Sequence, residues 1–318
     1  MTAALMPPTL QLLLPMLAAV CTAVAVDLAV AGKGLPPGFA VSWRRAMASG
    51  LVAGILFVGT FASLAVVAPG DAVDLAGIPW WQIFTLHALI AVTLFAWGVL
   101  AWAGFESADD GEQAEAAQEA ATPPPVADDP LPWRLDAESE AAVPPPTLAR
   151  RLATDFRFAV APGKSVLTEI GLGLAVGPVI WFLVIAASAT AAVLLGALDS
   201  NLLPSGEMPP MVAFLAAQPF LVRLGASLSA GFFEETFFRG FLQPRLGIAF
   251  STVLFVLAHW SYGSPFMLIG VTLLSLAYAA LARWRGNVWA AAAAHAAFDA
   301  IQLLVVLPNA ARLVGGGG

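Results

Sequence analysis

Two adjacent glutamates and an arginine interrupt a long apolar stretch in the segment GFFEETFFRG, residues 231–240. Glu235 and Arg239 are four residues apart, so on a helix they share one face and can form an ion pair. Glu234 is turned about 100° away from Glu235 and points elsewhere. An opposite charge favours the ionised form of a carboxyl, so Arg239 would keep Glu235 charged and oriented. The spacing predicts that Glu235 supports the site and that Glu234 acts as the base.

Histidines lie in other apolar segments. His295 and Asp299 are also four residues apart, so the carboxylate can accept the imidazole N–H, fix its tautomer and raise its basicity. His259 lies on a separate segment. His87 has no partner that the spacing identifies, and we interpret it as a packing residue. Taken singly, each feature also fits a structural role: an ion pair, an interfacial histidine or a helix-packing hydrogen bond.

The depth of these residues in the membrane favours a shared function. Turns are expected near Gly247 and Gly286. With a helical rise of about 1.5 Å per residue, Glu234, His259 and His295 lie roughly 20, 18 and 14 Å from these turns. Ionisable side chains inside spans usually face a wet cavity or one another. Three helices are therefore expected to bring one glutamate and two histidines to a similar depth.

Such a set of side chains predicts hydrolysis. Two neutral imidazoles and a carboxylate suit zinc with an open position for water. The metal ligands would be His259 and His295, with Glu234 or Asp299, and a second carboxylate would act as general base. Without a metal, a Glu–His pair can activate water directly. The residue types leave both routes open.

The composition is that of an integral membrane protein. The chain has 318 residues, of which 59% are hydrophobic and 11% charged, whereas a soluble domain carries about 25% charged residues. A spanning helix needs roughly 20 apolar residues. The sequence therefore predicts an all-α, polytopic membrane helical bundle with about eight transmembrane helices, at 9–31, 46–68, 82–104, 168–197, 211–243, 247–261, 264–283 and 287–308. The spacing of Gly173 and Gly177 permits close helix packing.

Charged residues in the connections predict the topology and the domains. Short cytoplasmic loops are enriched in Lys and Arg, and on this rule both termini lie outside the plasma (inner) membrane. Residues 106–150 are acidic and rich in Pro and Ala, which predicts a disordered cytoplasmic linker. It separates a three-span N-terminal region, 1–105, from a five-span core, 151–318. The chain has no basic patch with interleaved aromatic residues, which argues against nucleic-acid binding.

Three motifs carry a resemblance to a known family. The segments EETFFR (234–239), FVLAH (255–259) and HAAFD (295–299) match EExxxR, FxxxH and HxxxN/D. In this order on consecutive spans, they resemble the CPBP family of intramembrane proteases, which includes CAAX prenyl endopeptidases and bacteriocin-processing or Abi-like self-immunity proteins. The resemblance covers roughly residues 165–308. It implies an all-helical bundle with a conical cavity open to the cytoplasm and a peptide-bond hydrolase there.

The resemblance also implies roles for individual residues. Glu234 and His259 would activate the water, and Glu235 and Arg239 would support them. His295 and Asp299 would bind metal or steady the tetrahedral intermediate. Eukaryotic CAAX enzymes have Asn where this chain has Asp299. Because an ionised Asp cannot donate to an oxyanion, metal ligation or histidine orientation is its more natural role.

The expected function is therefore an intramembrane metallo-endopeptidase that cleaves a small peptide or a membrane protein at the lipid bilayer. Its cofactor would be Zn²⁺, unless a metal-free glutamate mechanism operates. One alternative is a catalytically inactive immunity or scaffold protein of the same fold. Another is a proton-coupled transporter that uses Glu and His as a relay, although the sequence shows no inverted repeat of the kind many transporters have. The sequence makes no prediction of the oligomeric state.

Overall fold

The computed structural model describes residues 47, 50–55, 79–101, 148–198, 210–259 and 265–315. The predicted span 9–31, most of 46–68 and nearly all of the linker 106–150 lie outside these residues. Within them every regular element is helical, as predicted. These are η3 (Trp80–Phe84), α4 (Thr85–Ala101), α6 (Leu148–Asp155), α7 (Val166–Ala197), α8 (Pro210–Ala217), α9 (Phe220–Ser229), η4 (Ala230–Glu234), η5 (Thr236–Leu242), α10 (Gln243–Ala258), α11 (Pro265–Arg285), α12 (Trp289–Ala300), η7 (Ile301–Val306) and α13 (Leu307–Gly315).

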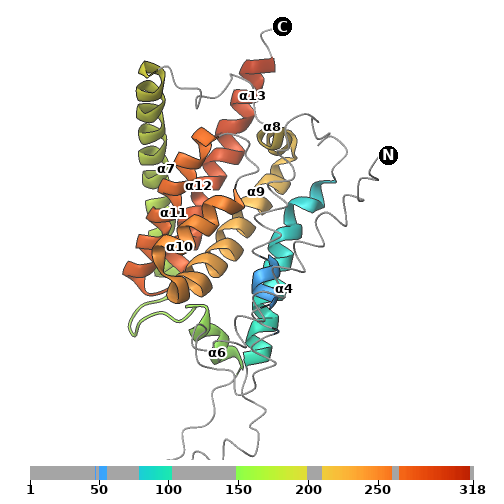
Figure 1. Ribbon diagram of the computed structural model, residues 1–318, viewed down its shortest axis with the longest axis vertical. Coiled ribbons are helices and arrows are strands. Elements are labelled where there is room, and N and C mark those ends of the chain that lie inside the picture. The colour runs from blue at the N-terminus through green and yellow to red at the C-terminus, as the bar shows by residue number, and fades with distance from the viewer. Residues whose placement is uncertain are drawn as a thin grey trace, which may run out of the picture.

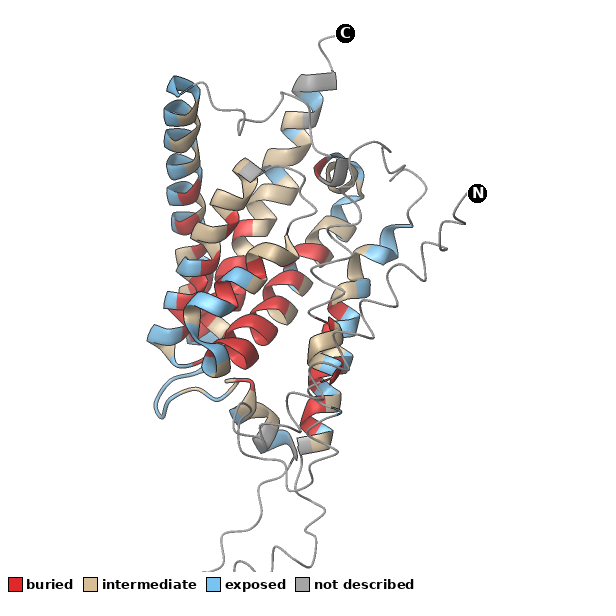
Figure 2. Cartoon of the chain, in the orientation of Figure 1, coloured by how far each residue is buried: buried red, intermediate tan, exposed pale blue. Residues whose placement is uncertain are grey.

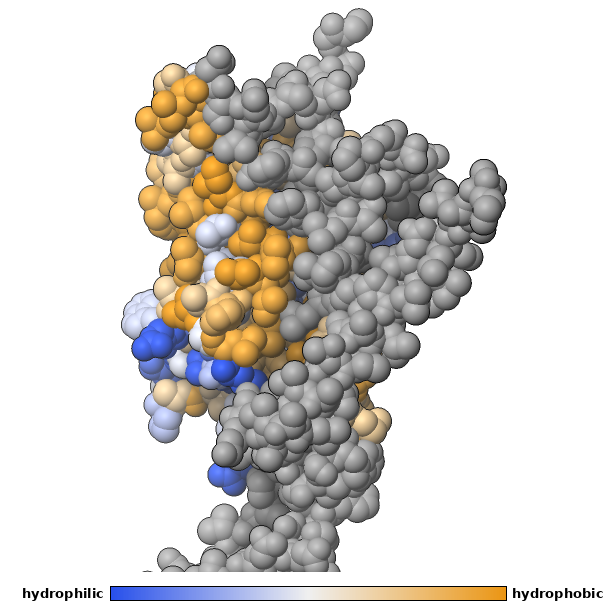
Figure 3. Space-filling model, in the orientation of Figure 1, coloured by the Kyte–Doolittle hydropathy of each residue, from blue (hydrophilic) through white to orange (hydrophobic). Residues whose placement is uncertain are grey.

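Five helical segments of the described chain are long and apolar enough to cross a membrane: Trp80–Leu100, Val166–Ala197, Phe220–Ala258, Phe266–Arg285 and Trp289–Ala310. Apolar side chains cover the flank of the bundle, and hydrophilic ones gather at the end that carries α6 (Figure 3). The chain is thus a multi-pass membrane protein, while the total of eight spans stays a prediction.

Helix α12 is the centre of the bundle. It packs most extensively against α7, and it also contacts α9, η4 and α11. In Figure 1, α7 runs along one flank and α4 along the other, with α9 to α12 between them. Buried residues concentrate where these central helices meet and on part of α4 (Figure 2).

Close packing of α7 on α12 depends on glycine. A Cβ atom built on Gly177 would lie 2.7 Å from the carbonyl oxygen of Ala294, and one built on Gly173 would collide with the backbone at Ala290. Both contacts are with backbone atoms, which cannot swing away as a flexible side chain would. The small-residue spacing predicted for this segment is therefore used at a real helix contact.

Replacement of Gly177 by Ala is expected to destabilise the protein, because the new methyl group must force α7 away from α12. Overpacking of this kind costs about 1–3 kcal/mol. Gly171→Ala, on the same helix, is the matched control, since its Cβ would meet no atom within 4 Å. The measurement is the thermal unfolding midpoint in detergent. Equal midpoints for the two variants would contradict this account of the contact.

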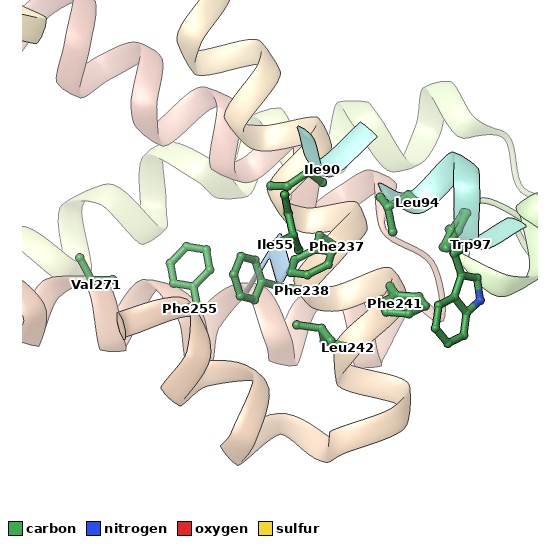
Figure 4. Packing of buried hydrophobic residues seen from close by; sticks show 11 residues of the cluster. Ile55, Ile90, Leu94, Trp97, Phe237, Phe238, Phe241, Leu242, Phe255 and Val271 are labelled. Atoms are coloured by element: carbon green, nitrogen blue, oxygen red, sulfur yellow. The ribbon is translucent and has the colours of Figure 1, made fainter. Parts of the chain in front are cut away.

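Helix α4 shares a hydrophobic core with the segment that holds the two glutamates. Ile90, Leu94 and Trp97 of α4 pack with phenylalanines of η5 (Figure 4). The Trp97 ring meets the Phe241 ring edge-on, with centroids 4.6 Å apart. The third predicted span is therefore packed directly against the EExxxR segment.

The predicted fifth span, 211–243, is not continuous. It divides at Gln218 and Pro219 into α8 and α9, because proline lacks an N–H and disfavours helical geometry in the residue before it. The turn predicted near Gly247 is present, with φ 79° and ψ 172°. Beyond it the chain folds back, so that the Ser251 hydroxyl donates to the Phe238 carbonyl at 2.8 Å. The long segment Phe220–Ala258 thus reverses its direction at Gly247, as the prediction of two separate spans, 211–243 and 247–261, requires.

The hydrophilic end is held by a partly buried ion pair. Arg285 at the end of α11 donates to both carboxylate oxygens of Glu169 on α7, at 2.7 and 2.6 Å. Glu169 is fully buried. Nearby, the Trp289 indole donates to the Phe158 carbonyl at 2.8 Å. These contacts attach the start of α7 and the chain before it to the ends of α11 and α12 that flank their turn.

Candidate active site

The two glutamates lie in a widened part of the helix. Glu234 is the last residue of the π-helical segment η4, and Glu235 separates it from the π-helical η5. Such turns are rare and recur at functional sites. The sequence pattern, which we interpreted with regular α-helical geometry, did not reveal this feature.

Glu235 is held by two partners in the fully buried core. Its Oε2 lies 3.1 Å from Arg239 Nε, and its Oε1 lies 2.9 Å from His295 Nδ1. Arg239 Nη2 donates to the hydroxyl and the carbonyl of Ser275 at 3.2 and 3.3 Å, and its guanidinium lies 4.3 Å from the centre of the Phe255 ring. The predicted i,i+4 ion pair is present, and it also connects to α11 and α12.

Glu234 faces a different set of groups, as its position on the helix predicted. Its Oε1 lies 3.3 Å from His87 Nε2, and its Oε2 lies 3.7 Å from His259 Nε2. Among the described residues, Oε2 has no hydrogen-bond partner although it is buried. The His259 ring stacks on Phe255, with centroids 4.4 Å apart, and its Nδ1 donates to the Phe255 carbonyl at 2.7 Å. That donation fixes the orientation of the His259 ring.

His295 bridges the two carboxylates of different helices. Its Nδ1 is bonded to Glu235, and its Nε2 lies 3.4 Å from Asp299 Oδ2. The ring stacks on Tyr278 with centroids 4.9 Å apart. The predicted contact between His295 and Asp299 is thus present, and Glu235 adds a partner that spacing along one helix could not indicate.

The interpretation of His87 as a packing residue is wrong. The ring lies between Glu234 and Ser229, with its Nδ1 2.9 Å from the Ser229 hydroxyl. His87 is 147 positions from Glu234, and helical periodicity relates only residues of the same helix. The chain has three histidines, and all three contact one of the two adjacent glutamates.

A cavity of about 410 Å³ borders these groups. His87, Glu234, His259, His295 and Asp299 line it together with apolar residues of α7, α11 and α12. Cavities of this kind, mostly apolar with a few converging polar groups, are typical of binding sites. The buried carboxylates and imidazoles are therefore accessible to a ligand of the cavity's size.

The described residues do not fit the predicted zinc site. No three His, Cys, Asp or Glu side chains in the described ranges converge as a metal ion requires. Both ring nitrogens of His295 face carboxylates, and His259 Nδ1 donates a hydrogen bond to the Phe255 carbonyl. We therefore derive no catalytic step that involves a metal, and zinc binding stays a prediction.

Known proteins offer an independent comparison. Residues 216–301 match the family described as Type II CAAX prenyl endopeptidase Rce1-like. This segment contains six of the residues above, Glu234, Glu235, Arg239, His259, His295 and Asp299, and it excludes His87. The "Uncharacterized protein YpbD" of Bacillus subtilis (strain 168) is 30% identical over 103 residues, which are 32% of this chain and 53% of that protein. The chain thus spans about half the length of this relative.

No solved structure matches the chain significantly. The family match includes all three motifs on which the resemblance was based. Residues 216–301 of this chain are thus similar to the family of Type II CAAX prenyl endopeptidases.

Proposed function

We propose that the protein is an intramembrane endopeptidase in which Glu234 and His259 activate a water molecule. The family is one of proteases, which supports a hydrolase in general terms. The observation that carries the specific proposal is the geometry of these two side chains. Glu234 Oε2 is buried without a hydrogen bond among the described residues, 3.7 Å from His259 Nε2, at the wall of the cavity.

Both facing atoms are hydrogen-bond acceptors. The Phe255 carbonyl can only accept, so His259 Nδ1 must carry its proton, and in the neutral ring Nε2 then has a lone pair. The oxygen of an ionised Glu234 also accepts only. A separation of 3.7 Å is too long for a direct hydrogen bond, so we propose that a water molecule bridges the two atoms. One water molecule can donate a proton to each atom, which polarises it for attack.

In the proposed reaction, Glu234 takes a proton from this water while the oxygen attacks the carbonyl carbon of the peptide bond. The developing oxyanion requires hydrogen-bond donors nearby. His295 lines the cavity, and carboxylates face both of its ring nitrogens, Glu235 at Nδ1 and Asp299 at Nε2. Because ionised carboxylates only accept, the ring in this proposal carries a proton on each nitrogen, and its Nε2–H is our candidate donor to the oxyanion. Glu234 then transfers the proton to the leaving amine. Glu235 and Arg239 keep His295 in place.

The substrate is proposed to insert an apolar side chain into the cavity, because α7, α11 and α12 contribute mainly aliphatic and aromatic groups to its wall. Small peptides and membrane proteins at the bilayer fit this description. The finer topology belongs to the same proposal: eight spans in the plasma membrane, with both termini outside and the acidic linker in the cytoplasm. The hydrophilic end that carries α6 would then face the cytoplasm.

Gly270→Leu is expected to narrow the range of peptides that the protein cleaves. Gly270 lines the cavity, and a Cβ atom there would lie 3.5 Å from Ser188 Oγ and 3.6 Å from Val184 Cγ1, an ordinary contact that the fold can accept. We expect kcat/KM to fall by about 10-fold or more for peptides with a large apolar side chain, and less for those with alanine. Gly171→Leu is the control, since its site is open. An equal loss for all peptides would contradict the assignment of the cavity.

The proposed activity is tested with the protein purified in detergent and a library of quenched fluorescent peptides. The wild type is compared with Glu234→Gln and His259→Ala, and both variants are expected to lose cleavage while they retain the unfolding midpoint. Cleavage that neither substitution affects would refute the mechanism. Folded wild type that cleaves no peptide or membrane-protein substrate would favour a scaffold role. Metal analysis of the same samples, with and without chelator, tests the zinc prediction.

A further inference from the structure

We propose that His87 and Ser229 form a positioning pair for Glu234, so that α4 belongs to the active site. This inference rests on the proposed function, in which Glu234 is the base. It adds a residue that lies outside the family-matched segment and outside all three motifs.

The contacts of His87 form a chain that ends on Glu234. The residue is 7% exposed, and its ring lies nearly parallel to Phe233, with centroids 6.4 Å apart. Its Nε2 lies 3.3 Å from Glu234 Oε1, and its Nδ1 lies 2.9 Å from Ser229 Oγ. Because α4 also packs on η4, the ring is held at this place by the surrounding helices.

The direction of the hydrogen bonds follows from the chemistry of the groups. An ionised carboxylate only accepts, so His87 must donate its Nε2 proton to Glu234. In the neutral ring Nδ1 then accepts, and the Ser229 hydroxyl is the donor within reach. That hydroxyl has a single proton and an alternative acceptor, the Ala226 carbonyl at 3.1 Å. The Glu234 carboxylate therefore selects the histidine tautomer with the proton on Nε2, and Ser229 supports this tautomer when its own proton points to Nδ1.

This pair occupies one carboxylate oxygen and leaves the other for catalysis. With Oε1 bound to His87, Oε2 is the oxygen that faces His259. Without His87, the carboxylate can rotate about its last bond, and a buried oxygen loses its donor. The function of His87 is thus to fix which oxygen of Glu234 meets the water.

Kinetics of four single variants and one double variant test this role. His87→Leu is expected to lower kcat by about 10- to 100-fold with little change in KM, because a displaced base slows the chemical step. His87→Gln should recover most of kcat, since its amide can donate from a similar position. Ser229→Ala should lower kcat less, and it should have no further effect in the His87→Leu background. Val92→Ala, at a 65% exposed position of α4, is the control and should behave as wild type.

The outcomes separate this inference from the proposed function. If Glu234→Gln is inactive but His87→Leu retains wild-type kcat, the positioning role is refuted and the function stands. If Glu234→Gln is fully active, the function itself fails. If His87→Leu does not fold, His87→Gln and Ser229→Ala still decide: full activity in Ser229→Ala, with no rescue by His87→Gln, refutes the role.

A second readout requires no substrate. Protein labelled with ¹⁵N at histidine has only three imidazole side chains to resolve by NMR. We expect His87 to carry a proton on Nε2, and we expect its signals to shift in both Ser229→Ala and Glu234→Gln. An unprotonated Nε2, or signals that neither substitution moves, would overturn the proposal.

Discussion

Glu234→Gln is expected to lower kcat by about 10²- to 10⁴-fold, the usual contribution of a general base. Glutamine has nearly the same shape as glutamate, and its amide oxygen can still accept from His87 Nε2, which lies 3.3 Å from Glu234 Oε1 in the wild type. It cannot take a proton from water. The substitution therefore removes the base while it preserves the surrounding contacts, and KM should change little.

The measurement is cleavage of one peptide under saturating and limiting concentrations, together with the thermal unfolding midpoint. Glu169→Gln is the matched control, because this buried carboxylate binds Arg285 and is not among the described residues that line the cavity. We expect that control to lose stability but to keep the kcat of the folded fraction. Turnover by Glu234→Gln comparable to that of wild type would show that another group is the base.

Glu235→Ala is expected to affect stability more strongly than any other single substitution in the site. It leaves the Arg239 guanidinium buried with no carboxylate, and both side chains are fully buried in the wild type. Removing one partner of a buried pair costs about 3–5 kcal/mol. His295 loses a partner in the same variant, because its Nδ1 is bonded to Glu235 Oε1.

A double variant tests the origin of this loss. Replacing both residues, as Glu235→Leu with Arg239→Met, removes the unpaired charge and should restore much of the stability, since apolar pairs of similar volume often substitute for buried ion pairs. Unfolding followed by tryptophan fluorescence in detergent provides the measurement. Should Glu235→Ala unfold at the wild-type midpoint, Arg239 must be held by Ser275 and the Phe255 ring alone.

The sequence by itself determined the features that depend on local chemistry and helical periodicity. Apolar runs show a helical membrane protein, because a chain in lipid must satisfy its backbone hydrogen bonds within each segment. The spacing of four residues predicted contacts between Glu235 and Arg239 and between His295 and Asp299, and both contacts are present. The different partners of the two glutamates follow from the same geometry. Gly247 was identified as a turn by its place between two apolar runs.

Only the tertiary structure decided which helices meet. The contact of His87 with Glu234 joins α4 to η4, and no periodic pattern links residues so far apart in the sequence. Likewise, the bond between Glu235 and His295 depends on how η4 and α12 pack. Pro219 is a local signal for the break in the fifth predicted span. The length of the apolar run nevertheless led to the prediction of one continuous span. The cavity is formed between several helices, so its existence and its lining follow from packing and not from any one segment.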